Sequence, residues 1–263
     1  MAEANYTLND PRRRRPRLHL EMSGTVMKIY GCVTMLFYSL SMSVIQNGLI
    51  HVSDYGPGEL SEAMASDPDL MVLSGWGSAF QLVGGLAVPV FAFLLVEGFL
   101  HTSDLKRYIL TVLGCAVVSE APYDLCVYGT WWSMRGQNAM FTYAICLVML
   151  YGLRLLENGS GRHRLLKLLL VVAASLWCVM LQCAFGLCTV LLAAIYYLWR
   201  EEKGTRVLLG CAVSIMYVTA PLSGYAIWNY NGRRGWVTGK RKYIFYALYP
   251  AHLLVLGLIA RAM

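Results

Sequence analysis

The feature that most constrains this chain is a series of apolar segments long enough to cross a lipid bilayer. As one helix, the longest would extend about 54 Å, against ~30 Å for the hydrocarbon core of a bilayer, so we divide it into two spans at 183–186. With that division, the pattern predicts an all-α fold with about eight transmembrane helices. The apolar segments lie at residues 26–50, 71–100, 105–127, 139–156, 165–200, 206–229 and 242–260.

Composition supports a polytopic integral membrane protein. Hydrophobic residues make up 57% of the chain and charged residues 14%, whereas soluble domains carry roughly 25% charged residues. A water-soluble fold of this size could not bury that much apolar surface. We therefore expect one transmembrane domain at residues 26–263, preceded at residues 1–25 by a disordered basic arm on the cytoplasmic side.

The distribution of charge predicts topology rather than nucleic-acid binding. The net charge is +7, but the basic residues gather between the apolar segments, as the positive-inside rule requires of cytoplasmic loops. The loop at 51–70 has five acidic residues and no Lys or Arg, so we place it outside. A seventh crossing at 206–229 would then put the basic loop 230–242 outside as well. Either one segment does not cross the membrane fully, in which case we expect 71–100 to hold a re-entrant piece, or the loop is basic for a reason other than topology.

Three groups of residues resemble the TraX family of membrane proteins. The C-terminal group is "YNGRRG" at 230–235 followed by "KYIFYALYPAHLLVL" at 242–256. The central group combines "VPVFAFLLVEGFLHTSDLKRYIL" at 88–110 with "SEAPYDL" at 119–125. The third is "QNAMFT" at 137–142. Together with their spacing, these stretches cover most of residues 27–260.

The resemblance implies a membrane acyltransferase-like fold in a bacterial cytoplasmic membrane. The basic residues from Arg12 to Arg17 place the N-terminus in the cytoplasm. The family is named for a protein that acetylates the N-terminus of a conjugative pilin. It is similar to transmembrane acyltransferases that use acyl-CoA and modify sugars or peptides. The resemblance therefore implies acetyl-CoA as an acyl donor that is not tightly bound, and a peptide or glycan acceptor.

The chain departs from the family pattern at three polar positions. Lys28 keeps the basic position on the first helix, but the Asp-His pair of the family is replaced by Tyr38-Ser39. The expected arginine is Gly85, and the expected Asp-Tyr-Gly is Leu181–Cys183. Serine cannot replace imidazole as a general base, so any catalysis must rely on other residues.

His252 is the first candidate for that role, because it lies near the centre of the last apolar segment. An ionisable group at that depth usually faces the protein interior, and Pro250 should kink the helix and free a carbonyl near Tyr246. We expect His252 to be catalytic, with Glu120 as its orienting partner and Tyr249 nearby. A buried packing histidine is the alternative.

Other polar residues are candidates for catalysis or for binding the substrate and donor. We expect Glu97 to be catalytic near the donor, with His101 one turn away. Basic side chains in the loop at 230–242 could bind the phosphates of a CoA-type donor, or anionic lipid instead. The residues assigned to binding are Lys28, Ser39, His101, Asn138, Asn231, Arg233, Arg234, Tyr246 and Tyr249.

Three functions remain open on the sequence alone. The first is an acyltransferase that acetylates an amine or hydroxyl. The second is a non-catalytic relative that binds a lipid, an acyl ligand or an assembly partner, and the third is a small-molecule transporter. No P-loop, GxSxG or zinc-spaced Cys/His cluster is present in the sequence, so we expect no metal site. An active enzyme should have a cavity that reaches His252 from the cytoplasmic face.

Overall fold

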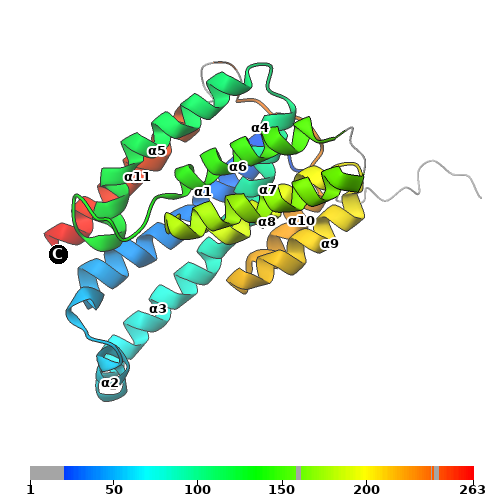
Figure 1. Cartoon of the computed structure of the whole chain (residues 1–263). Helices are drawn as coiled ribbons and strands as arrows, with labels where there is room; N and C mark the ends of the chain where they lie inside the picture. Colours follow the sequence, from blue (N-terminus) through cyan, green and yellow to red (C-terminus); the bar gives the residue numbers. More distant parts are fainter. Residues whose placement is uncertain (1–20, 158–160, 238, 240–242) are drawn as a thin grey trace, which may run out of the picture.

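The computed structural model describes residues 21–157, 161–237, 239 and 243–263, and these residues form a helical bundle (Figure 1). Residues 1–20 of the expected basic arm lie outside the described part. The elements in chain order are α1 (Gly24–Leu40), η2 (Ser41–Ile50), η3 (Val52–Asp54), α2 (Glu59–Ser66), α3 (Pro68–Gly85), α4 (Ala87–Leu100), α5 (Leu105–Tyr128), α6 (Ala139–Leu155), α7 (Gly161–Met180), α8 (Gly186–Leu198), α9 (Lys203–Ser214), η4 (Ile215–Tyr217), η5 (Ala220–Ser223), α10 (Gly224–Trp228) and α11 (Tyr243–Ala262).

Short polar side chains begin several of these helices. Asp104 Oδ1 accepts a hydrogen bond from Arg107 N at 2.9 Å, and Asn138 Oδ1 accepts one from Met140 N at 3.0 Å. Asp67 caps α3 in the same way. Such caps satisfy backbone N–H groups that have no partner within the first turn. They place the helix starts where the sequence changes from polar loop to apolar segment.

The expected spans are largely confirmed. Among the described residues, five helical passages are long and apolar enough to cross a membrane, and α6 and α8 are shorter apolar helices. The division of 165–200 is confirmed, because α7 ends at Met180 and α8 begins at Gly186. α1 continues into η2, a π-helical segment, without leaving the bundle. The fold is all-α, as expected.

The segment at 206–229 does not cross the bundle, which corrects the expected count of about eight crossings. α9 has 12 residues, or about 18 Å of helix, and the chain then turns back through η4, η5 and α10. Lys203 Nζ lies 5.1 Å from the ring centroid of Trp228, so the start of α9 and the end of α10 lie together. We call residues 203–228 the re-entrant hairpin.

The tip of the hairpin is hydrogen-bonded to the middle of the membrane span formed by α3 and α4. The Ser223 hydroxyl donates to the Leu86 carbonyl at 2.7 Å, and the Thr219 hydroxyl donates to the Leu82 carbonyl. These carbonyls lie beside the junction of α3 and α4, near the middle of Pro68–Leu100. Irregular backbone at membrane depth is tolerated where protein satisfies it. The expectation that 71–100 holds the re-entrant piece is therefore wrong.

The hairpin resolves the conflict over topology, because it returns the basic loop to the end where the chain starts. Met22 N donates to Asn229 O at 3.0 Å, and Gly24 N donates to Arg233 O at 2.8 Å. Arg234 Nη2 donates to the His101 carbonyl at 2.9 Å. We call the end of the bundle at residues 22–24, 101–107, 199–206 and 229–237 the basic end.

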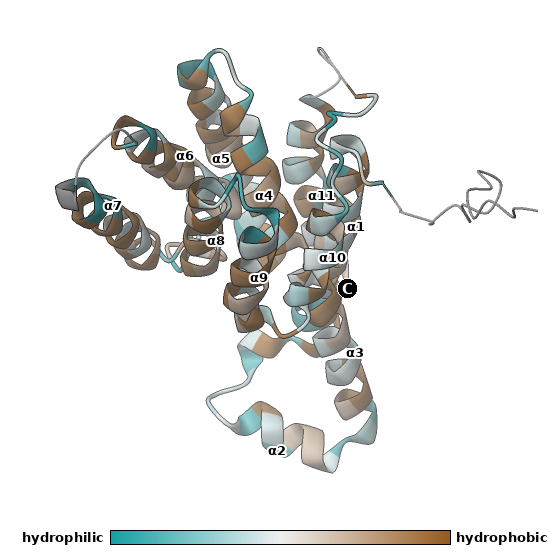
Figure 2. Cartoon of the chain, turned by 90° about the vertical axis from the view of Figure 1, so that its right-hand side faces the viewer, coloured by the Kyte–Doolittle hydropathy of each residue, from teal (hydrophilic) through white to brown (hydrophobic). Residues whose placement is uncertain are grey.

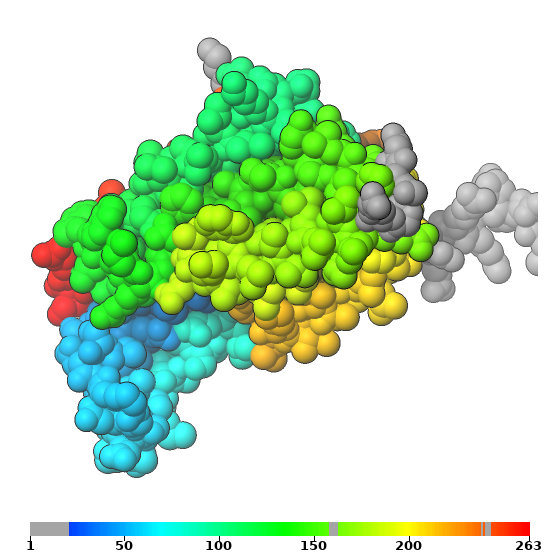
Figure 3. Space-filling view, viewed as in Figure 1, coloured from blue at the N-terminus to red at the C-terminus, as the bar shows by residue number. Residues whose placement is uncertain are grey.

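The outer surface of the bundle is apolar, as a lipid-facing surface requires. Large exposed hydrophobic side chains include Val118 at 66% and Met71 at 64% relative exposure, and brown apolar residues cover the helices in Figure 2. The acidic segment around α2 projects from the bundle at the end opposite to the basic end (Figure 3). Five membrane-length helical passages with this surface indicate a multi-pass membrane protein.

Candidate functional site

Two polar side chains from opposite ends of the sequence meet inside the bundle. Ser39 Oγ on α1 lies 3.1 Å from Nε2 of His252 on α11. Ser39 is 4% exposed and His252 is 7% exposed. The expectation that His252 faces an interior polar site rather than lipid is therefore confirmed. The Tyr249 ring packs beside the imidazole, with ring centroids 5.7 Å apart.

The other nitrogen of His252 sets the direction of this hydrogen bond. Nδ1 lies 2.9 Å from the Leu248 carbonyl, which can only accept, so a neutral ring carries its proton on Nδ1. Nε2 then has a lone pair, and the Ser39 hydroxyl donates to it. This arrangement joins a hydroxyl to an oriented base.

Pro250 frees a backbone carbonyl on α11, as expected. Because proline has no N–H, the Tyr246 carbonyl lacks its usual helical donor. The Cys115 thiol on α5 donates to that carbonyl at 3.5 Å. The contact ties this carbonyl of α11 to α5 about two turns before His252.

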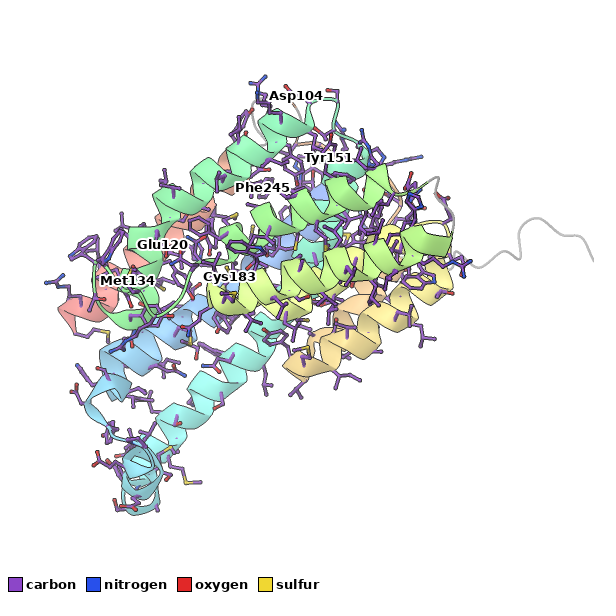
Figure 4. The ribbon with its side chains drawn as sticks, in the orientation of Figure 1. Asp104, Glu120, Met134, Tyr151, Cys183 and Phe245 are labelled. Atoms are coloured by element: carbon purple, nitrogen blue, oxygen red, sulfur yellow. The ribbon has the colours of Figure 1, made fainter. Side chains whose placement is uncertain are left out.

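A cavity of about 780 Å³ connects this region with the basic end. On α1 its lining includes Lys28 and Ser39, which are eleven residues or about 16 Å of helix apart. At the basic end it reaches the surface beside Asp104 and Arg107, which are exposed. Figure 4 shows Asp104 at that end, with Phe245 of α11 further into the bundle. Tyr246 and Tyr249 also line the cavity.

The mouth of the cavity carries positive charge from three elements. Lys28, Arg107 and Arg234 all line it. Lys28 Nζ lies 5.5 Å from the centroid of the Phe245 ring, a cation–π contact. The sequence did not single out Arg107, because its place at the mouth follows from the packing of α5 and not from its neighbours in sequence.

The loop after the re-entrant hairpin is fixed to the start of α1. The Thr25 hydroxyl donates to Arg234 O at 3.1 Å and accepts from Val237 N at 3.2 Å. Gly235 has φ +82°, and an added Cβ would collide with Thr25, so this position requires glycine. Asn231 Oδ1 accepts from Arg233 N at 3.0 Å. Asn231 and Arg233 shape the loop, while Arg234 lines the cavity.

Glu97 and His101 also line the mouth. His101 Nδ1 lies 2.8 Å from the Glu97 carbonyl oxygen and 3.7 Å from its carboxylate, so the two form the expected pair. The Tyr230 hydroxyl donates to Glu97, and burial together with this carboxylate raises the pKa of Tyr230 to about 12. Tyr230 therefore stays a hydrogen-bond donor at neutral pH.

Glu120 does not contact His252, contrary to expectation. Asn138 Nδ2 donates to the Ala116 carbonyl at 2.8 Å and also to Glu120 Oε2. In the described part of the chain, Glu120 Oε1 is buried without a hydrogen-bond partner. Neither Glu120 nor Asn138 is among the lining residues of the cavity. Both hold α5 to the start of α6, and Figure 4 shows Glu120 far from Asp104.

Two of the three departures from the family pattern lie away from the cavity. Gly85 lies under the tip of the re-entrant hairpin, where an added Cβ would come within 3.3 Å of Tyr217. Leu181–Cys183 lie in the turn between α7 and α8, where Cys183 pairs with Gln137 at the end opposite to the basic end. The remaining departure, Tyr38-Ser39, lines the cavity with both of its residues.

Sequence analysis missed the contact between Ser39 and His252. Ser39 was noted because the family has a histidine there, and His252 because of its depth in the last segment. Their 213-residue separation left no local pattern to connect them. Across the described residues, no group of three or more His, Cys, Asp or Glu could hold a metal ion.

Comparisons with known proteins agree with the resemblance noted in the sequence. The family model described as TraX protein matches residues 27–260. A curated relative, the "Probable fimbrial assembly protein FimC, serogroup H1" of Dichelobacter nodosus, is 24% identical over 226 residues. That alignment covers 74% of this chain and 89% of the relative. No solved structure matches.

Proposed function

Because this chain belongs to the TraX family, we propose that it is a membrane acyltransferase. In this proposal it moves an acetyl group from acetyl-CoA to an amine or hydroxyl of a peptide or glycan. One observation carries the proposal: a cavity leads from a mouth with three basic side chains to Ser39, whose hydroxyl is bonded to His252.

The two ends of the cavity suit the two ends of a CoA thioester. Lys28, Arg107 and Arg234 at the mouth offer charge and hydrogen bonds to phosphates. The lining between them and Ser39 is largely apolar and aromatic, and it can hold the flexible thioester arm. Near the floor, His252 offers a base with its proton-free nitrogen directed at Ser39.

The name of the curated relative suggests the acceptor. The Dichelobacter nodosus protein is described as a probable fimbrial assembly protein. We therefore propose a peptide of a surface filament as the acceptor. We also propose a bacterial cytoplasmic membrane as the location, with the basic end in the cytoplasm, where acetyl-CoA is made.

A non-catalytic role is the second candidate, and the family departures favour it. Gly85 and Ser39 stand where the family pattern has arginine and histidine. In this case the cavity would hold a lipid, an acyl ligand or part of an assembly partner without turnover.

Acetyl-CoA consumption by the purified protein in detergent separates the two candidates. With a filament-derived peptide as acceptor, the acyltransferase should release free CoA and acetylate the peptide. His252→Gln should lower the rate by about 10²–10⁴-fold. His163→Gln, on α7 and outside the cavity lining, is the matched control and should keep full activity. Binding of acetyl-CoA without hydrolysis or transfer would refute the acyltransferase.

A further inference from the structure

The order of the two polar groups along the cavity suggests how the acyl group is passed on. Ser39 lines the cavity, and His252 does not appear among the lining residues of the described part. The imidazole lies behind the hydroxyl, so a thioester entering from the basic end meets Ser39 first. We propose that Ser39 is a nucleophile that carries the acyl group covalently between donor and acceptor. This inference rests on the proposed acyltransferase function.

The geometry around Ser39 is that of an activated nucleophile. The 3.1 Å distance from Ser39 Oγ to His252 Nε2 lies within the reach expected for a nucleophile and its base. The Leu248 carbonyl holds Nδ1 at 2.9 Å and so acts as the third, orienting group.

The surrounding helices hold Ser39 in place. The Cys126 thiol donates to the Ser39 carbonyl at 3.9 Å. An added Cβ at Gly84 would collide with Tyr38, so α3 packs directly on the turn that precedes Ser39. Two residues after Ser39, the helix widens into the π-helical η2, a feature often found at functional sites.

The reaction balances without any further reactant. His252 Nε2 takes the proton of the Ser39 hydroxyl while Oγ attacks the thioester carbonyl carbon. The carbon–sulfur bond breaks, the thiolate leaves with the proton from His252, and Ser39 holds the acyl group as an ester. His252 then takes a proton from the acceptor amine or hydroxyl, which attacks the ester carbonyl. The ester bond breaks, and Ser39 regains its proton from His252.

Two cysteines, Cys32 and Cys126, also line the cavity, and Cys126 is the competing nucleophile because its thiol contacts the Ser39 backbone. Its thiol is directed at a carbonyl that can only accept, and no imidazole or carboxylate is bonded to it in the described residues. A thiol that donates to a backbone carbonyl is not activated by a base. The test must nevertheless distinguish acylation at Ser39 from acylation at Cys126.

The experiment is to trap the acyl group on the full-length protein in detergent. Purified protein is mixed with radiolabelled acetyl-CoA, quenched in acid at times shorter than one turnover, and mapped by peptide mass spectrometry. We expect one acetyl group on Ser39. Ser39→Ala should carry none and lose transfer, whereas Ser39→Cys should carry a thioester that neutral hydroxylamine removes. His252→Gln should slow labelling by about 10²–10⁴-fold.

Controls separate the covalent step from folding and from the wider function. Ser43→Ala removes another buried serine one turn along the same passage and should label like the wild type. Labelling at Cys126 would overturn the inference, and so would full transfer by Ser39→Ala with Ser39 unmodified at every time point. In both cases acyl transfer itself would stand. If the wild-type protein neither labels, hydrolyses nor transfers, the proposed function fails, and the inference fails with it.

Discussion

The re-entrant hairpin makes a quantitative prediction about stability. Its tip donates two side-chain hydrogen bonds to the backbone of the α3–α4 passage, from Thr219 to Leu82 and from Ser223 to Leu86. Hydrogen bonds between membrane helices contribute about 0.6 kcal/mol on average and about 1.7 kcal/mol at most. Thr219→Val with Ser223→Ala removes both donors with little change in volume, so we expect a loss of about 1–3 kcal/mol in the free energy of unfolding.

The assay is unfolding in mixed micelles with a rising fraction of denaturing detergent, followed by fluorescence of the seven tryptophans. The double variant should unfold at a lower detergent fraction. Thr130→Val with Ser53→Ala changes the same residue types at exposed positions and should leave the midpoint unchanged. Equal midpoints for both double variants would refute the anchoring of the hairpin tip at these carbonyls.

Three further predictions concern topology, donor binding and packing. Single cysteines at Ala63 and Arg233, both outside the helical spans, in a cysteine-free background should react with an impermeant reagent from opposite sides of the membrane; labelling from one side would contradict the hairpin. Arg107→Gln should raise the KM for acetyl-CoA by about tenfold, or ~1.4 kcal/mol, with kcat unchanged, while Arg135→Gln at the other end should change neither constant. Gly84→Ala should lower the free energy of unfolding by about 1–3 kcal/mol because its Cβ meets Tyr38, measured against Gly75→Ala, where the added Cβ meets no atom within 4 Å.

The helical passages could be predicted from the sequence because bilayer thickness sets their length. Hydropathy located the spans and the break before Gly186, since a helix must stay apolar for the whole hydrocarbon core. Hydropathy could not predict the re-entrant hairpin, because 206–229 is as apolar as a segment that crosses the membrane. Its turn depends on hydrogen bonds from Thr219 and Ser223 to another part of the chain, and a hydropathy pattern contains no information about such contacts.

The candidate site was predicted in part for a similar reason. The depth of His252 in an apolar segment indicated an interior position, because lipid exposure of an ionisable group is costly. Its partner could not be predicted, since Glu120 and Ser39 both lie at interior depths and helix packing decides between them. In the structure, Glu120 accepts a hydrogen bond from Asn138, and His252 accepts one from Ser39.

The central claim is that acetyl-CoA occupies the cavity with its thioester at Ser39, and an experimental structure with a non-hydrolysable acetyl-CoA analogue tests it most directly. The account predicts phosphates beside Lys28, Arg107 and Arg234, and the analogue's carbonyl carbon about 3–3.5 Å from Ser39 Oγ, as a reactive arrangement requires. A cavity filled by lipid at saturating analogue, or an analogue bound with its carbonyl away from Ser39 and His252, would contradict the account.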